Sequence, residues 1–477
     1  MITLGHVFAA LTDYQPRGQE PALTSVVIDS RQAVKGSLFV AFVGENVDGH
    51  DFVEDAFRRG AVAALVQRPV ARSYHTVRLR AGDTNGEGLA EIPASPLCLL
   101  VDNTLDALQR IAAYWRRRHH LTVVGITGSV GKTSTKELTA AVLSRRGRTL
   151  KSEGNYNNEI GLPLTVLQLN ARHRYAVLEM GMYATGEIAT LCRIAAPAIG
   201  VVTNVGPVHL ERLGSLEAIV AAKQELVAAL PADGVAILNR DEPLVMGMAA
   251  HTAARVFTYG LGDNGDAPRA DLWADEIASM GLDGIRFRLH YQGATLYIRV
   301  PLLGRHSVHT ALRAAAVGLN CGLSWDEIVT GLQDRRTQLR LVAVDGPRGS
   351  LLIDDTYNSS PESAIAALNL LADLDGRRIA VMGDMLELGA AAEQGHRMVA
   401  RRAVDVADIL ITVGPLGRMM GEEALALGMP ASHVHILPDH TAAAALLATV
   451  IEPDDVILVK GSRGVHLDQL VTALSTS

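Results

Sequence analysis

Cysteine is scarce in this chain, and its copies lie far apart. The 477 residues contain only Cys98, Cys192 and Cys321, and no two of them have the paired spacing of zinc ligands. This excludes a disulfide framework and a cysteine zinc site. The length suggests roughly three domains, and an apolar content of 48% is ample for sizeable cores.

Long apolar runs and basic tracts are also missing. No apolar stretch reaches the ~18 residues of a membrane span, and residues 1–15 lack a basic region followed by a long apolar segment. The formal net charge is −7. We therefore expect a cytoplasmic protein with no membrane insertion and no nucleic-acid partner.

Lysine is the scarce cation. Arginine carries most of the positive charge, and the sequence has only six lysines: Lys35, Lys132, Lys136, Lys151, Lys223 and Lys460. The two residue types differ because only an amine can lose its proton near neutral pH and react as a nucleophile. Each remaining lysine is therefore a candidate for a role that arginine cannot fill.

The segment GITGSVGKTSTKE, residues 125–137, has the features of a phosphate-binding loop. The apolar run 121–127 predicts a buried strand, and residues 134–147 have helical spacing with Gly147 as a stop. Backbone N–H groups and the positive helix end bind phosphate oxygens at such a junction. Lys132 would neutralise the β- and γ-phosphates, and the Thr133 hydroxyl would bind Mg²⁺. The candidate loop residues are Gly128, Ser129, Gly131, Lys132, Thr133 and Ser134.

This loop departs from the common pattern G-x-x-x-x-G-K-[ST]. Ile126 stands where the first glycine is expected, so only the shorter G-x-x-G-K-T remains, from Gly128 to Thr133. The alternative interpretation is a glycine turn followed by a surface lysine. The strand and helix predicted on either side favour the phosphate loop.

The order of predicted elements divides the chain into three zones, all α/β. Residues 1–115 contain strands, a helix and a Gly/Pro/Asp-rich stretch at 80–96 that predicts a surface loop. Residues 116–318 alternate strands and helices, as in a mainly parallel sheet, and include an antiparallel hairpin at 284–303. Residues 319–477 predict a second doubly wound domain. Strands are expected at 25–30, 36–44, 61–67, 121–127, 175–181, 198–206, 234–243, 349–356, 377–384, 408–414, 433–438 and 455–462.

Polar side chains follow several of these strands, where open parallel sheets bind ligands. They are Glu179, His209, Asn239, Asp241, Asp354 and Asp355. A carboxylate at such a position is often only a helix cap. Glu179 and His209, in one zone with the phosphate loop, form a more specific set, because both residue types bind the divalent cations that phosphoryl transfer needs.

Lys223 lies on an apolar face of a predicted helix, since Ile219, Lys223 and Leu226 follow the spacing i, i+4, i+7. One interpretation is a lysine whose amine reaches along the helix to water. The other is a desolvated amine with a lowered pKa. Such an amine adds CO₂ to form a carbamate, an anion that binds metal.

Several segments together resemble the Mur ligases, and the resemblance covers essentially the whole chain. They are TGSVGKTSTKE, GNYNNEIGLPLTVL, LEMGMYATGEI, TNVGPVHLERLGSLEAIVAAKQEL, DDTYNSSPES, VMGDMLELG, LVKGSRG and the N-terminal stretch from residue 29 to 66. NYNNEIG and DDTYNSSPES favour the members that join D-alanyl-D-alanine to UDP-N-acetylmuramoyl-tripeptide. The resemblance implies an ATP-dependent, ADP-forming peptide ligase of peptidoglycan precursor synthesis, working through an acyl phosphate.

The family fold implies a UDP-substrate domain at 1–115, a central ATP-binding domain at 116–318 and a C-terminal Rossmann-like domain at 319–477. The resemblance also implies roles for residues. The catalytic set is Lys132, Lys223, His209 and Glu179, and the Mg²⁺ ligands are Thr133, Glu179, His209 and a carbamylated Lys223. The nucleotide contacts that it implies outside the loop are His306, Thr310, Arg340 and Asp355. Substrate contacts fall to Ser30, Arg31, Asn155, Asn158, Tyr357 and Asn358. A monomer is expected.

One segment departs from the family pattern. The family has His-Asn-x-x-Asn near the adenine, whereas GRHSVHTALRAAAVG keeps His306 but has Ser307 and Thr310 in place of the asparagines. An amide both donates and accepts, and a hydroxyl is shorter and does only part of this. The adenine contact, and with it the nucleotide preference, is therefore open.

Other functions compete with this prediction. A sister ligase would add a diamino acid to the UDP-muramoyl dipeptide. A folylpolyglutamate synthase would lack the N-terminal uridine domain, which residues 29–52 resemble. A P-loop ATPase switch would hydrolyse ATP without amino acids. A catalytically inactive relative would lack the set formed by Lys132, Glu179 and His209, which is intact here.

Overall fold

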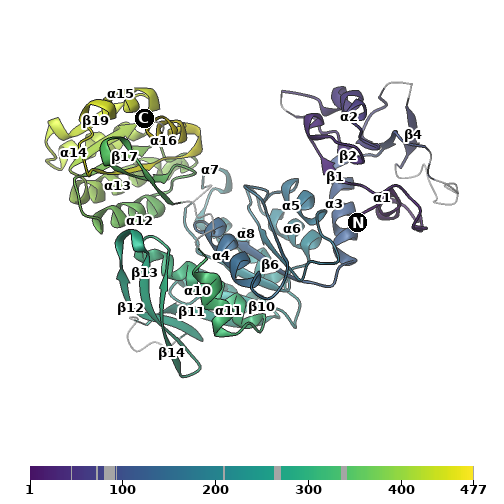
Figure 1. The fold of residues 1–477 in the computed structure, drawn as a ribbon, viewed down its shortest axis with the longest axis horizontal. Helices are drawn as coiled ribbons and strands as arrows, with labels where there is room; N and C mark the ends of the chain where they lie inside the picture. Colours follow the sequence, from purple (N-terminus) through teal and green to yellow (C-terminus); the bar gives the residue numbers. More distant parts are fainter. Residues whose placement is uncertain are drawn as a thin grey trace. The chain divides into compact units, whose positions relative to one another are not determined.

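The computed structural model describes residues 1–44, 46–70, 74–79, 92, 94–207, 210–262, 270–334 and 341–475. Its chain forms two compact units. The first comprises Met1–Gly125, Gly147–Met182 and Gly186–Ala198, and the second comprises Ile126–Arg146, Tyr183–Thr185 and Ile199–Ser477. Figure 1 labels many of the elements of both units. Among the described residues, no helix is long and apolar enough to cross a membrane.

The first unit begins with a parallel sheet. Its described strands have the order β1-β2-β3-β5-β4. Helix α2 packs on this sheet through Val53 and Phe57, which join a buried cluster with Phe39 and Val66. The predicted strands at 25–30, 36–44 and 61–67 are confirmed, whereas β4 and β5 were not predicted. Of the surface loop predicted at 80–96, only residues 92 and 94–96 are described. The elements are α1 (Leu4–Leu11), β1 (Ser25–Val27), β2 (Ser37–Val40), α2 (Val53–Arg58), β3 (Ala63–Val66), β4 (His75–Arg78), β5 (Leu97–Leu100) and α3 (Thr104–Arg117).

A second part of this unit lies against helix α3. The Trp115 Nε1 donates to the Leu169 carbonyl at 3.0 Å, and the buried Arg116 donates from Nε to the Ala195 carbonyl at 2.8 Å. These hydrogen bonds connect α3 to segments that follow the phosphate loop in the sequence. The elements are β7 (Thr149–Lys151), α5 (Gly161–Val166), β8 (Tyr175–Glu179), which runs parallel to β7, and α6 (Glu187–Ala195). Strand β6 (Thr122–Thr127) begins in the first unit and ends in the second.

The second unit starts with helix α4 (Lys132–Leu143), which follows the phosphate loop. Its strands β9 to β12 are parallel neighbours, and β12 to β14 are antiparallel. The predicted hairpin is confirmed, because β13 and β14 are joined by Gln292 and Gly293 with φ of 47° and 80°, values that suit a tight two-residue turn. The strands are β9 (Ile199–Val202), β10 (Val235–Asn239), β11 (Arg255–Leu261), β12 (Leu272–Ser279), β13 (Ile285–Tyr291) and β14 (Ala294–Val300), of which β11 and β12 were not predicted.

Helix α10 (Val308–Asn320) packs against α4 and against β11 and β12. Its alanine-rich sequence has high helix propensity. Most of its residues are buried, as expected for a helix inside a core. Other helices of this part are α7 (Leu210–Leu213), α8 (Leu216–Ala228), α9 (Pro243–Met246) and α11 (Trp325–Leu332).

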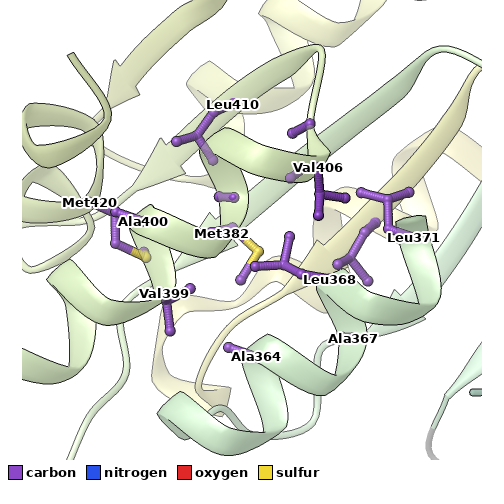
Figure 2. Packing of buried hydrophobic residues seen from close by; sticks show 14 of the residues in the cluster. Ala364, Ala367, Leu368, Leu371, Met382, Val399, Ala400, Val406, Leu410 and Met420 are labelled. Atoms are coloured by element: carbon purple, nitrogen blue, oxygen red, sulfur yellow. The ribbon is translucent and has the colours of Figure 1, made fainter. Parts of the chain in front are cut away.

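The remaining strands of the second unit form a sheet of order β15-β16-β20-β17-β18-β19, parallel except for β15. Figure 2 shows the core on one face, where Leu368 of α12 lies beside Met382 of β17 and Leu371 of α12 lies near Val406 of α13. Helices α15 and α16 cover the other face, so the doubly wound prediction is confirmed. The elements are β15 (Val342–Asp345), β16 (Leu351–Asp355), α12 (Pro361–Ala372), β17 (Arg378–Gly383), α13 (Ala392–Val406), β18 (Ile409–Val413), α14 (Gly417–Ala426), β19 (Val434–Leu437), α15 (His440–Val450), β20 (Val456–Lys460) and α16 (Leu467–Ser475).

Candidate active site

The predicted phosphate loop lies between β6 and α4, as its flanking sequences indicated. Gly128 has φ of 144°, and a Cβ there would lie 1.8 Å from the Thr203 Oγ1, so no larger residue fits. Gly131 has φ of 82° and caps the N-terminus of α4. The helix begins at Lys132 and ends at Leu143, earlier than the predicted stop at Gly147, because residues 144–146 form turns.

The end of β9 fixes the shape of this loop. The Asn204 carbonyl accepts from the Ser129 N–H at 3.0 Å, and its Oδ1 accepts from the Val130 N–H at 2.8 Å. The Thr203 hydroxyl donates to the Val130 carbonyl at 2.7 Å. Ser129 Oγ also donates to the Gly206 carbonyl at 3.0 Å. Side chains and backbone carbonyls of residues 203–206, which follow β9, therefore hold the loop.

Lys132 lies over this loop. Its Nζ donates to the Gly128 carbonyl at 2.8 Å and to the Ser129 carbonyl at 3.2 Å. Both of these acceptors are backbone carbonyls, which hold the ammonium group beside the loop. The geometry fits the predicted phosphate-binding role.

A cavity of about 320 Å³ opens beside the loop within the second unit. It brings together many of the predicted nucleotide and substrate residues: Ser129, Gly131, Lys132, Thr133, Ser134, His306, Thr310, Asp355 and Asn358. It also includes charged residues to which the sequence analysis gave no role: Glu242, Arg313, Glu362 and Lys460. Its lining offers both hydroxyl and cationic groups to a phosphorylated ligand.

Asp355 is held by a lysine that was not predicted. Lys460 is 1% exposed, and its Nζ donates to Asp355 Oδ2 at 2.6 Å and to the Asn358 carbonyl at 3.0 Å. The two charged residues are register partners on β16 and β20. Two signals in the sequence pointed to Lys460: the scarcity of lysine, and its place in the family-like segment LVKGSRG. Its ammonium sets the orientation of the predicted nucleotide ligand Asp355.

The segment that departs from the family pattern borders the same cavity. Thr310 is buried, and the Ser307 hydroxyl donates to the Leu303 carbonyl at 2.7 Å. His309 also lines the cavity, and its Nδ1 is buried with no hydrogen-bond partner in the described part of the chain. Burial first, and then the charges of Arg313 and His306, lower the pKa of His309 to about 3. His309 is therefore a neutral imidazole here.

Lys223 lies on α8 and is 3% exposed. Burial, together with the charge of Lys132, lowers the pKa of its amine well below 10.5. No described residue forms a hydrogen bond or ion pair with this amine. The desolvated-amine interpretation agrees with this burial, and the interpretation in which the side chain reaches water does not.

Glu179 ends β8 in the first unit and is 1% exposed. Its Oε1 accepts from the Asn157 Nδ2 at 2.9 Å. Helix α6 has Gly186 as its N-cap, so Glu179 is not a helix cap. The sequence analysis named Asn155 and Asn158 from this segment but missed Asn157.

Asn155 and Asn158, which the sequence analysis named, have other environments in the structure. Asn155 is exposed, and Asn158 Oδ1 accepts from the Gly161 N–H at 2.8 Å, at the start of α5. His209 and Arg340 lie outside the described residues. Among the residues that are described, no three His, Cys, Asp or Glu side chains form a ready metal site.

The remaining predicted substrate residues are not among those that line this cavity. Ser30 is buried and donates to Asp55 Oδ2 at 2.9 Å, whereas the Arg31 side chain is 80% exposed and pairs with Asp29 at 2.7 Å. Tyr357 is exposed. A second cavity, of about 870 Å³, lies in the first unit between residues 23–32 and residues 148–172, and Gln32 and Tyr156 line it.

A phosphate loop in an α/β chain with a doubly wound C-terminal sheet defines a P-loop enzyme. Three family models match: the Mur ligase family catalytic domain at residues 22–116, the Mur ligase middle domain at 126–318, and the Mur ligase glutamate ligase domain at 335–463. The chain belongs to the Mur ligase family, as the resemblance predicted, and the three-domain α/β fold class is confirmed.

Particular relatives match along the whole length. The UDP-N-acetylmuramoyl-tripeptide–D-alanyl-D-alanine ligase of Synechocystis sp. is 38% identical over 95% of this chain and 92% of its own. The crystal structure of MurF from Acinetobacter baumannii has a TM-score of 0.84 at 29% identity and covers 100% of this chain and 99% of its own. MurF from Thermotoga maritima in complex with ADP has a TM-score of 0.79 at 26% identity, covering 95% of this chain and 97% of its own.

Proposed function

We propose that the protein joins D-alanyl-D-alanine to UDP-N-acetylmuramoyl-tripeptide, with ATP converted to ADP and phosphate. The observation that carries this is the cavity in which the phosphate loop, His306, Thr310 and Asp355 meet. Relatives with this activity, similar over at least nine-tenths of both chains, support it. ATP is the proposed nucleotide, because a MurF neighbour binds ADP.

The chemistry explains why a cation is needed at the phosphate loop. A carboxylate is a poor electrophile because its leaving group would be oxide. Its oxygen therefore attacks the γ-phosphorus of ATP, and ADP leaves. The D-alanyl-D-alanine amine then attacks the acyl carbon of the acyl phosphate, and phosphate leaves as the amide forms. Lys132 offsets the repulsion between carboxylate and γ-phosphate in the first step.

We also propose a divalent cation as cofactor, from the chemistry of the donor groups. The resemblance assigns Thr133, Glu179, Lys223 and His209 to its binding; the structure describes Thr133 and Lys223 in the second unit and Glu179 in the first. Hydroxyl and carboxylate oxygens are ligands that Mg²⁺ prefers, and the buried Lys223 amine, with its lowered pKa, suits carbamate formation. Bound Mg²⁺ would spread the negative charge of the phosphates.

Phosphate release tests the proposal. We expect ATP-dependent release only when UDP-N-acetylmuramoyl-tripeptide and D-alanyl-D-alanine are both present. Greater turnover with the UDP-dipeptide and a free diamino acid would favour the sister ligase. Release from ATP alone, unaffected by either substrate, would favour a P-loop switch.

Three further assignments belong to this proposal. Domain boundaries near residues 115 and 318 are supported by the ranges of the family models. A cytoplasmic location would supply both ATP and the UDP-linked substrate. A monomer is proposed, and light scattering of the purified protein measures this directly.

A further inference from the structure

Arg313 is a buried cation in the wall of the nucleotide cavity. It lies on α10, one helical turn after His309, and is 5% exposed. Its Nε donates to the Tyr259 hydroxyl at 2.7 Å, its Nη1 to the Thr135 Oγ1 at 3.2 Å and its Nη2 to the Thr203 carbonyl at 3.3 Å. All three acceptors are neutral.

This guanidinium has no ion-pair partner in the described ranges of the chain. Glu242 lines the same cavity without forming an ion pair with Arg313; burial raises the pKa of its carboxyl, and the charge of Arg313 opposes this rise. A buried charge without an opposite charge destabilises the protein unless another group compensates it. An anionic ligand in this cavity would add an opposite charge beside Arg313, whose own hydrogen-bond acceptors are neutral.

Two hydrogen-bond partners of Arg313, Thr135 and Thr203, are themselves connected to the phosphate loop. Thr135 lies in the first turn of α4. Thr203 bonds to the Val130 carbonyl through its hydroxyl. The Nη1 also lies 3.2 Å from the position that a Cβ on Gly131 would take. The charge of Arg313 therefore adds to the positive N-terminal end of α4, where anions bind.

We propose that Arg313 is a positioning residue for the polyphosphate of the nucleotide. It braces the loop through Thr135 and Thr203 and supplies a second positive charge besides Lys132. This rests on the proposed function only in taking a nucleoside di- or triphosphate as the ligand. The effect acts on the phosphates and is independent of the base.

Binding of ADP and of inorganic tripolyphosphate to the full chain tests this, by calorimetry at several salt concentrations. Arg313→Gln should weaken both ligands by about 10-fold or more, the scale of one charge-assisted hydrogen bond. It should also reduce the salt dependence of binding. Arg313→Lys, which keeps the charge, should recover most of the affinity, and in turnover the Gln variant should raise KM for ATP more than it lowers kcat.

Arg116→Gln is the matched control, since Arg116 is also buried but its hydrogen bonds go to backbone carbonyls of the first unit. It should lower the thermal midpoint and leave ADP affinity unchanged. Wild-type affinity in Arg313→Gln, equal loss in the Lys and Gln variants, or loss for ADP but not for tripolyphosphate would each overturn the role of Arg313. If the wild type bound neither ligand, both this inference and the proposed function would fail.

Discussion

Replacing Lys223 with methionine should stabilise the protein while it removes activity. The side chain is 3% exposed and shares a helix face with the fully buried Ile219 and Leu226. Methionine has nearly the same length and needs no hydration, so it fits this environment. The amine of the wild type is desolvated instead. Each unit by which burial lowers its pKa destabilises the folded protein by about 1.4 kcal/mol at a pH below the pKa of the folded state.

The pH dependence gives the sign of this effect. The folded pKa of Lys223 lies below 10.5 because of burial and Lys132. Between the folded pKa and 10.5, the unfolded chain binds more protons, so the stability of the wild type rises with pH across this window. Lys223→Met lacks this dependence. Its advantage in unfolding midpoint should therefore be largest at neutral pH and shrink toward pH 10.

The assay compares thermal midpoints of the two proteins in CO₂-depleted buffer from pH 7 to 10. Added bicarbonate should raise the midpoint of the wild type alone, because only an amine forms a carbamate. A lower midpoint for Lys223→Met at pH 7 in CO₂-depleted buffer would refute the argument from desolvation.

Activity measurements on Lys223 variants distinguish a carbamate at this position from a simple positive charge. Lys223→Arg should be about as inactive as Lys223→Ala, although it keeps charge and approximate length. Short carboxylates should partly restore the alanine variant by supplying an anion, and they should not restore the arginine variant, whose side chain fills the space. Substantial turnover by Lys223→Arg would exclude the carbamate.

Two further predictions concern the nucleotide cavity. Lys132→Ala should lower turnover by ~10²-fold or more, as expected for loss of one preorganised electrostatic group; near-normal turnover with an unchanged circular dichroism spectrum would reject a phosphate role. Thr310→Asn should tighten binding of ATP relative to GTP, because an amide both donates and accepts. An unchanged ratio of the two dissociation constants would mean that another residue recognises the base.

Features that depend on neighbouring residues were predictable from the sequence. The phosphate loop follows from glycines between a strand and a helix, and the hairpin from period-two alternation around Gln292 and Gly293. The buried face that carries Lys223 follows from helical spacing. In each case the deciding contacts lie within one element or between adjacent ones.

Features that depend on distant segments were missed. The pairing of Lys460 with Asp355 joins residues 105 positions apart and needs the register of two strands. Arg313 lies three residues after Thr310, but its contacts with Tyr259, Thr203 and Thr135 span 54 to 178 positions. No local pattern distinguishes it from a solvated arginine on a helix.

The position of β20 has a consequence for synthesis of the chain. This strand pairs with both β16 and β17, so these two strands lie on either side of it and do not pair with each other. At ~5–20 residues per second, the ribosome needs on the order of ten seconds to pass from the end of β16 to the end of β20. During this time β16 and β17 each have an unpaired edge, which is a site for aggregation. A nascent chain that stops before Val456 would therefore have an open, divided sheet in place of a shorter but complete domain.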